Sequence, residues 1–217
     1  LDFFKDLDDI RHSFRRYAEL IPEGGALVIN SDIDNLDYFT EGLKCNVITV
    51  GSDPEKSMYS AANITYDEFA RGSYDLVVNG ETKTHIVLKV TGEHNIYNSL
   101  ASIAAAHFMG IDDNSIIAGL QQYGGTDRRF QYKGKLGDIT VIDDYAHHPD
   151  EIRATIKTLN IIHTRRCGLF SSHIHIQELR LYYQSSAKLY QKQTLLFLQI
   201  FTQQERKILS ESAQKML

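Results

Sequence analysis

The stretch ALVIN at residues 26–30 is short and apolar, and the turn formers PEGG at 22–25 precede it directly. Both features are typical of a buried strand. A second run of this kind, NVITV, stands at 46–50. A segment with helical spacing of its apolar side chains precedes each run, at 9–21 and at 34–43. Strands that alternate with helices predict an α/β fold with a parallel sheet.

The middle of the chain changes to an antiparallel pattern. Two apolar runs between residues 74 and 90 flank the pair Asn79-Gly80, which tolerates the positive φ angles of a tight hairpin turn. Helices are predicted over 95–108, with Gly110 at the C-cap, and over 114–123. The fold class is therefore α/β, with a mixed or parallel sheet plus an antiparallel hairpin.

A glycine pair then separates this part from the next one. Gly124-Gly125-Thr126 is interpreted as a hinge, and short strands are predicted at 130–132 and 139–142. Pro149 suits the first turn of a helix that reaches about Leu159. The chain is expected to continue into a second α/β unit.

Composition narrows the possible partners. The 217 residues carry 23 Lys and Arg against 28 Asp and Glu, a net charge of -5, which argues against nucleic acid and against an anionic membrane. No apolar stretch approaches the roughly 20 residues of a membrane helix. Two cysteines without Cys-x-x-Cys spacing, and no secretory leader, fit a reducing cytoplasm. The sequence does not indicate an oligomeric state.

Three segments carry the candidate chemistry, and the first is GEHNIYN at 92–98. Asn95 and Asn98 are three residues apart at the start of a helix and therefore share a face. Their amides can pair with the N6/N7 edge of adenine. The alternative is structural: Asn95 caps the helix, and Asn98 is a solvated surface residue.

The second segment is TDRRF at 126–130, two guanidinium groups directly after the flexible glycines. Arginine suits bidentate binding of phosphate, and a site beside a hinge can close on it when domains move. An exposed ion pair with Asp127 or Asp138 explains the same residues about equally well.

The third segment is DDYAHHPDE at 143–151, which places Asp143, Asp144, Tyr145, His147 and His148 between an apolar strand and a helix. Ligands of α/β proteins bind at that end of a strand. A metal site is a weaker interpretation, because adjacent histidines point apart and no third ligand with recognisable spacing follows. A purely structural loop is the remaining alternative.

In this order and spacing the three segments resemble the Mur ligase family, and DDYAHHPDEI at 143–152 is especially similar to its L-alanine-adding members. LDFFKDLDDIRHSFRRYAELIP at 1–22 is also similar to the family's central domain. The resemblance covers Leu1 to about Asn160. It implies that 1–125 is the C-terminal half of the central ATPase domain and that 126–160 begins a Rossmann-like C-terminal domain. A murein tripeptide-recycling ligase of the same family has a similar DDxAHHP loop and stays an alternative.

The resemblance also implies the reaction and its residues. The muramoyl carboxylate of UDP-N-acetylmuramate attacks the γ-phosphate of ATP, with Mg2+ on the phosphates, and L-alanine displaces phosphate from the resulting acyl phosphate. The nucleotide residues implied are Asn95 and Asn98 at adenine, Asp144 at the ribose, Tyr145 near the nucleotide and Arg129 at the transferred phosphate. Arg129 and His147 are the implied catalytic residues, and His147 and His148 lie near the reacting substrate.

The sequence also departs from the family. It contains no GxxGK[ST] phosphate loop, and the family's magnesium-binding histidine is expected just before the LDFF stretch. The UDP-binding domain and the first half of the ATPase domain are therefore expected to be absent. We predict a fragment that is inactive alone.

The tail at 161–217 is predicted to be out of family, and helical or disordered. One shifted reading frame, with suitable codons, turns 170–180 and 199–209 into family-like segments, which indicates a frame change near 160–163. The alternative is an authentic tail with an amphipathic helix pair around 179–201. In that case the chain is a non-catalytic globular module whose tail binds a partner.

Overall fold

The computed structural model describes residues 4–137, 139–146, 149–162, 166–171 and 195–200. It divides into two compact units with a boundary after Tyr123. Residues 66–71 and 90–92, at one end of the first sheet, group with the second unit. The predicted hinge lies at this boundary, and Gly125 has a positive φ of 99°.

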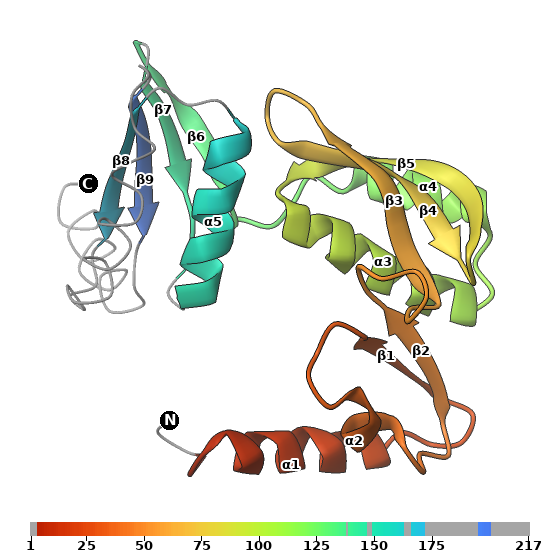
Figure 1. Cartoon of the computed structure of the whole chain (residues 1–217). Coiled ribbons are helices and arrows are strands. Elements are labelled where there is room, and N and C mark those ends of the chain that lie inside the picture. The colour runs from red at the N-terminus through yellow and green to blue at the C-terminus, as the bar shows by residue number, and fades with distance from the viewer. Residues whose placement is uncertain (1–3, 138, 147–148, 163–165, 172–194, 201–217) are drawn as a thin grey trace, which may run out of the picture. The chain divides into compact units, whose positions relative to one another are not determined.

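Figure 1 shows the elements of the first unit, whose sheet has the order β1-β2-β3-β4-β5. β1 pairs with β2 in parallel from Ala26↔Asn46 to Asn30↔Val50, and β2 pairs with β3 in parallel at Val50↔Tyr59. The elements are α1 (Leu7–Glu19), β1 (Ala26–Asn30), α2 (Leu36–Thr40), β2 (Asn46–Val50), β3 (Tyr59–Tyr66), β4 (Arg71–Val78), β5 (Glu81–Thr91), α3 (Glu93–Phe108) and α4 (Asp113–Gln122).

Turn residues determine how the antiparallel part is built. β4 ends at Val78 and β5 begins at Glu81, so Asn79 and Gly80 form a two-residue turn. Their φ values of 51° and 78° are those that a tight hairpin requires, and the predicted hairpin is confirmed. Gly110, with a φ of 76°, follows the end of α3 as predicted.

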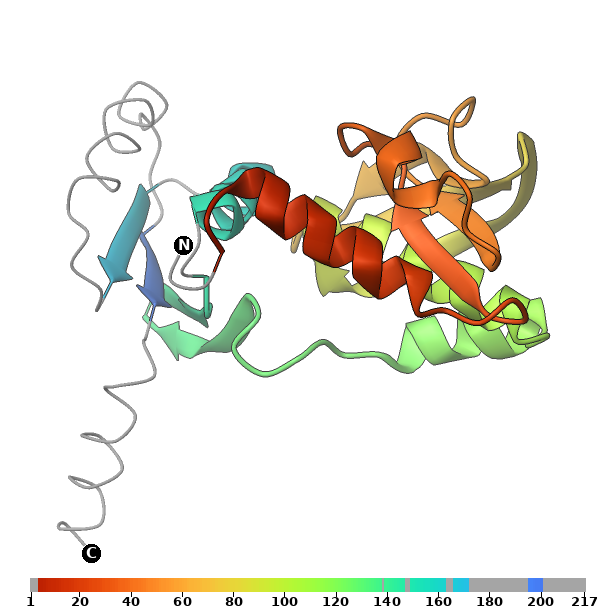
Figure 2. The same cartoon turned by 90° about the horizontal axis from the view of Figure 1, so that it is seen from below.

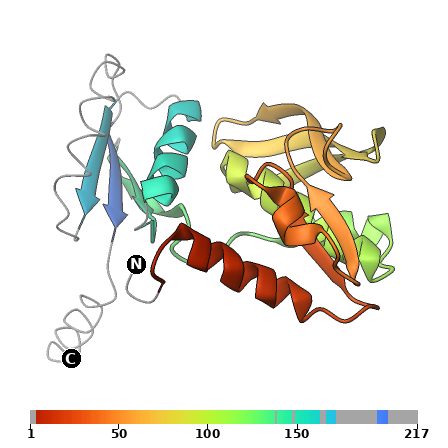
Figure 3. The same ribbon diagram turned by 60° about the horizontal axis from the view of Figure 1, so that its bottom comes forward.

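The core of the first unit lies between α3 and the sheet. α3 packs against β1 and β2, and Figure 3 shows it running along the sheet. Its residues Ile96, Leu100 and Ile103 are at most 1% exposed. Tyr74 is fully buried, and its hydroxyl lies 2.6 Å from the Ser99 hydroxyl. Burial raises the pKa of Tyr74 to about 12.

α1 and α2 contact each other, and Figure 1 and Figure 2 show both helices beside the strands β1 and β2. Arg15 donates from Nη1 to the carbonyl oxygens of Tyr38 and Glu41, at 3.1 and 2.8 Å. A cation at the last carbonyls of a helix is favourable, so Arg15 stabilises the end of α2. The predicted helix at 34–43 is shorter in the structure, because Asn35 has a positive φ of 58° and Glu41 is extended.

The second unit contains β6 (Gln131–Leu136), β7 (Ile139–Asp143), α5 (Pro149–Ile161), β8 (Arg166–Ser171) and β9 (Leu195–Ile200). Its sheet order is β6-β7-β9-β8. β6 is antiparallel to β7, whereas β9 is parallel to both β7 and β8. A mixed sheet whose β7, β9 and β8 are parallel, with α5 between β7 and β8 in the chain, agrees with the α/β class predicted for this part.

Two strands, β8 and β9, lie in the tail for which we predicted helix or disorder. Leu195–Ile200 is an apolar run that pairs with β7 from Thr140↔Leu196 to Asp143↔Gln199, so an extended form gives its backbone groups partners. Residues 172–194 and 201–217 lie outside the described part. The domain limits, the frame change and the helix pair therefore stay predictions.

Candidate functional site

The carboxyl end of β7 joins the second and third candidate segments. The N–H group of Tyr145 donates to the carbonyl oxygen of Arg128 at 2.7 Å. The Arg128 guanidinium lies over the Tyr145 ring, 4.9 Å from its centroid, and Arg128 Nε is 3.5 Å from Asp143 Oδ2. Residues far apart in the sequence therefore form one cluster within the second unit.

Arg129 is the more open of the two arginines. Its side chain is 52% exposed, whereas that of Arg128 is 17% exposed. Arg129 Nη1 donates to Glu151 Oε1 at 3.1 Å. A guanidinium has five N–H donors, so this contact leaves donors for an anion.

Asp144 is buried at 5% exposure. Its Oδ2 accepts a short hydrogen bond from the Thr155 hydroxyl on α5, which also lies 3.1 Å from the carbonyl oxygen of Glu151. α5 therefore fixes both the buried carboxylate of Asp144 and the exposed guanidinium of Arg129.

The two asparagines lie in the first turns of α3. The helix begins at Glu93, so Asn95 is inside it, and the structural alternative that Asn95 caps the helix is wrong. Asn98 Nδ2 donates to Asn95 Oδ1 at 3.2 Å, so the two amides share a face as predicted. Asn98 is exposed and Asn95 is half-buried.

The described residues do not test the whole predicted site. Asn95 and Asn98 belong to the first unit, whereas Arg129, Asp144 and Tyr145 belong to the second. A cleft that all five residues line stays a prediction. His147 and His148 lie outside the described residues.

Thr155 is the one residue of this cluster that the sequence analysis missed. Asp143 and Arg128 lay within the candidate segments, but the family resemblance gave neither of them a role. The spacing of Thr155, four residues after Glu151 on one helix, places both side chains on the same face and was the available signal.

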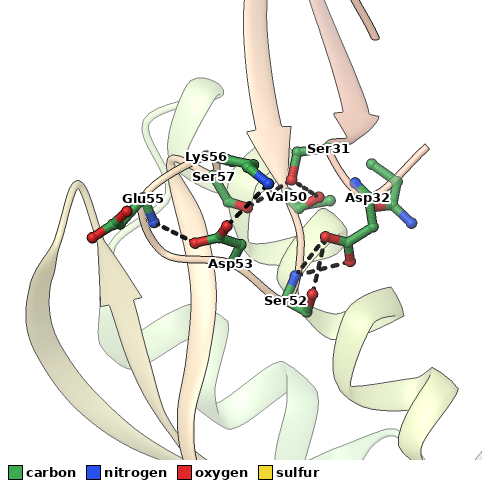
Figure 4. Close-up of polar contacts among 9 residues, drawn as sticks. Ser31, Asp32, Val50, Ser52, Asp53, Glu55, Lys56 and Ser57 are labelled. Atoms are coloured by element: carbon green, nitrogen blue, oxygen red, sulfur yellow. Dashed lines mark hydrogen bonds and ion pairs between the residues drawn. The ribbon is translucent and has the colours of Figure 1, made fainter. Parts of the chain in front are cut away.

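A second polar cluster lies at the carboxyl ends of β1 and β2 (Figure 4). The N–H group of Ser52 donates to Asp32 Oδ2 at 2.9 Å, and the Ser31 and Ser57 hydroxyls are 2.6 Å apart. Asp53 accepts from the N–H group of Glu55 at 3.0 Å. These contacts are internal and tie the loops after the two strands together, so the cluster is structural.

Two kinds of feature are absent from the described residues. They contain no helix that is long and apolar enough to span a bilayer. They also contain no group of three or more His, Cys, Asp or Glu side chains placed to hold a metal ion.

Comparisons with known proteins agree with the motifs. The family model for the Mur ligase middle domain matches residues 1–106, and that for the Mur ligase glutamate ligase domain matches 128–178. The second match ends past residue 160, the predicted limit of the resemblance.

Curated relatives are similar over most of the chain. A UDP-N-acetylmuramate--L-alanine ligase of Lachnospira eligens is 54% identical over 81% of this chain and 38% of its own length. The enzyme of the same name from Clostridium tetani is 35% identical over 95% of this chain and 45% of its own length. The chain thus spans less than half of these relatives.

A solved structure supports the fold. The crystal structure of the UDP-N-acetylmuramate-alanine ligase MurC from Thermotoga maritima superposes with a TM-score of 0.72 at 19% identity. The superposition covers 98% of this chain and 56% of that one. Together the family models, the relatives and the shared fold show that the chain belongs to the Mur ligase family.

Proposed function

We propose that the chain is part of an ATP-dependent ligase that joins L-alanine to UDP-N-acetylmuramate through an acyl phosphate, in cytoplasmic synthesis of peptidoglycan. The observation that carries the proposal is the 54% identity to a ligase of that name over 81% of the chain. The relatives reported above carry the name of the alanine-adding ligase, which favours it over the murein tripeptide-recycling ligase.

In this proposal the second unit binds the phosphate and ribose of ATP. Arg129 is half-exposed and keeps N–H donors beyond its contact with Glu151, which suits charge that grows on the transferred phosphoryl group. Asp144 holds the ribose with the carboxylate oxygen that Thr155 does not engage. Tyr145 lies beside the nucleotide.

The first unit contributes the adenine contacts. The amide pair of Asn95 and Asn98 presents donors and acceptors from one face of α3, which matches the N6/N7 edge of adenine. Asn98 is exposed, so its amide is accessible to a base. Closure of the two units at Gly124-Gly125 would bring adenine and phosphate contacts to one nucleotide.

The chemistry follows from positioning and electrostatics. ATP supplies the phosphoryl group that activates the muramoyl carboxylate. Arg129 stabilises the charge of that transfer, and His147 acts beside the reacting groups, with His148 near L-alanine. Mg2+ belongs to the family reaction, but the described residues offer no metal-binding cluster, so we assign it no residue of this chain.

An assay of phosphate release from ATP tests the proposal, with UDP-N-acetylmuramate and L-alanine as substrates. We expect turnover from a longer protein that also carries a phosphate loop and the family's C-terminal motif read in the shifted frame. We expect none from the 217 residues alone, since the β- and γ-phosphates lack the loop's N–H groups and its lysine. Arg129→Gln in the longer protein should lower kcat by about tenfold or more.

Two results would contradict the proposal. Substrate-dependent turnover by the 217 residues alone would show that the fragment has been misjudged. Turnover of the longer protein with a muropeptide, but not with L-alanine, would favour the recycling ligase. Sequencing the coding DNA across codons 155 to 170 decides separately whether the tail is authentic.

A further inference from the structure

The carboxylate of Asp143 is buried in a way that requires an explanation. Asp143 is the last residue of β7 and is 7% exposed. Its Oδ2 lies 3.5 Å from Arg128 Nε and 4.0 Å from Lys133 Nζ, while its Oδ1 is buried without a hydrogen-bond partner. A buried carboxylate is costly unless a cation compensates it. The ion pair with Arg128 is therefore needed wherever Asp143 stays charged.

Arg128 connects two segments through both its side chain and its main chain. The guanidinium lies between the Asp143 carboxylate and the Tyr145 ring. The carbonyl oxygen accepts the Tyr145 N–H group at 2.7 Å. The turn at 126–131 is thereby attached to the loop that follows β7.

The turn itself is strained. Arg128 has a φ of 63° and Phe130 a φ of 48°, a region that side chains other than Asn, Asp and Gly rarely adopt. Such a conformation persists only where surrounding contacts impose it. Arg129 stands between the two strained residues, so its direction depends on the contacts that hold Arg128.

The geometry points to Asp143 and Arg128 as positioning residues: the buried ion pair holds the strained turn so that Arg129 faces the phosphate and Tyr145 faces the nucleotide. This inference rests on the proposed function, because there Arg129 meets the transferred phosphate. Neither residue touches the nucleotide. They act through Arg129 and Tyr145.

The first measurement needs no ligand. In the NMR spectrum of the 217-residue chain, the Tyr145 ring should shift the side-chain signals of Arg128 upfield, because the guanidinium lies over its face. Asp143→Asn keeps the shape and removes the charge, so we expect this shift to decrease. Asp127→Asn is the matched control, since Asp127 is exposed and its carboxylate accepts a hydrogen bond from the Gln131 amide. An unchanged Arg128 shift in Asp143→Asn overturns the inference.

The second measurement is the affinity for ATP, followed by NMR titration of the same proteins. We expect Asp143→Asn and Arg128→Gln each to weaken binding by about tenfold, as Arg129→Gln does. The double variant of Asp143 and Arg128 should bind no more weakly than either single one, since the pair acts as a unit. Circular dichroism confirms that the variants are folded.

The outcomes separate this inference from the proposed function. Weaker binding in Arg129→Gln but not in Asp143→Asn overturns the positioning role and leaves the phosphate role of Arg129 intact. Equal binding by the wild-type chain and Arg129→Gln overturns the phosphate role, and the positioning role with it. Additive losses in the double variant overturn the claim that Asp143 and Arg128 act together.

Discussion

The two units differ in the polar groups that they bury. Among the described residues, the first unit buries neutral hydroxyl groups, which include those of Ser31, Ser57, Ser60, Ser99 and Tyr74. The second unit buries the carboxylates of Asp143 and Asp144 beside two threonines. A carboxylate is far more costly to bury than a hydroxyl. Such a cost is typical of functional sites, where charge and geometry matter more than stability.

Backbone strain shows the same difference. The non-glycine residues with positive φ in the described part of the first unit are Asn35, Asn63 and Asn79, a residue type that tolerates this region. In the second unit they are Arg128 and Phe130 at the candidate site and Ala70 in the turn between β3 and β4, none of which is of that residue type. The first unit therefore has the properties of a scaffold, and the end of β7 has those of a site.

The largest expected effect tests whether the scaffold depends on its apolar core. Leu100 on α3 is fully buried, so Leu100→Ala should lower the free energy of unfolding by about 2–5 kcal/mol, through lost burial and the cavity that remains. Urea denaturation measures it. Val87→Ala is the control, since Val87 is 49% exposed and should change stability by less than about 1 kcal/mol. Equal losses would show that α3 does not form the core.

The next effect concerns a buried neutral group, Tyr74. Burial raises its pKa in the folded chain from the ordinary tyrosine value of about 10 to about 12. Above pH 10 the unfolded chain loses this proton and the folded chain keeps it, so stability falls as the pH rises from about 10 to 12. The loss is about 2–3 kcal/mol at most. Below pH 10 the Tyr74 hydroxyl is protonated in both states, so it does not make the free energy of unfolding depend on pH.

Urea denaturation between pH 9 and pH 12 checks this. Tyr74→Phe removes the titrating hydroxyl, so its stability should fall less steeply above pH 10 than that of the wild type. Tyr132→Phe is the control, because Tyr132 is 60% exposed and should leave the slope unchanged. If the free energy of unfolding falls equally steeply with pH in the wild type and in Tyr74→Phe, the raised pKa of Tyr74 is not the cause of the fall.

A third effect tests the buried charge of the second unit. Thr155 and Thr158 are both buried on α5. The Thr158 hydroxyl donates to the carbonyl oxygen of Ala154, four residues earlier, whereas the Thr155 hydroxyl donates to the carboxylate of Asp144 and lies 3.1 Å from the carbonyl oxygen of Glu151. Thr155→Val should therefore lower the free energy of unfolding by about 1–3 kcal/mol, because a charged acceptor loses its donor.

Thr158→Val is the matched control for this effect. Its carbonyl partner in the helix keeps a main-chain N–H group, so the expected loss is below about 1 kcal/mol. Thermal unfolding followed on signals of the second unit compares the two. If Thr158→Val costs as much as Thr155→Val, the hydroxyl of Thr155 does not compensate the charge of Asp144.

Periodicity was sufficient to predict most of the fold. β1 was predicted at its observed limits, and α1, α3, α4 and α5 within about two residues, because their apolar spacing is regular. The strand at Tyr59–Tyr66 was missed. Two neighbouring residues of this strand, Tyr59 and Ser60, are both buried, so its buried positions do not alternate with exposed ones. Asn63 also adopts a positive φ of 51° within the strand, which a residue of regular β structure does not.

The candidate site was predictable in its residue types but not in its contacts. The sequence placed Asp144 and Tyr145 at a strand end and Arg129 beside a hinge. That Arg128 turns toward Asp143 depends on a left-handed backbone conformation of an arginine, which no local pattern indicates. The pairing is a tertiary property.

The smallest effect compares two glycines of the scaffold and tests whether its strand-end cluster is tightly packed. A Cβ at Gly51 would lie 2.2 Å from Ser31 Oγ and 2.8 Å from Ser57 Oγ, whereas a Cβ at Gly24 would meet nothing within 4 Å. Gly51→Ala must therefore displace the Ser31 and Ser57 hydroxyls, which are 2.6 Å apart and bonded to each other. Serine side chains can rotate, so we expect a loss of about 1 kcal/mol, the value of one hydrogen bond, rather than unfolding.

Gly24→Ala should be neutral or stabilise by about 0.4–1 kcal/mol, because alanine restricts the unfolded chain. Urea denaturation of both variants decides, and equal stability would show that the cluster in Figure 4 is loosely packed.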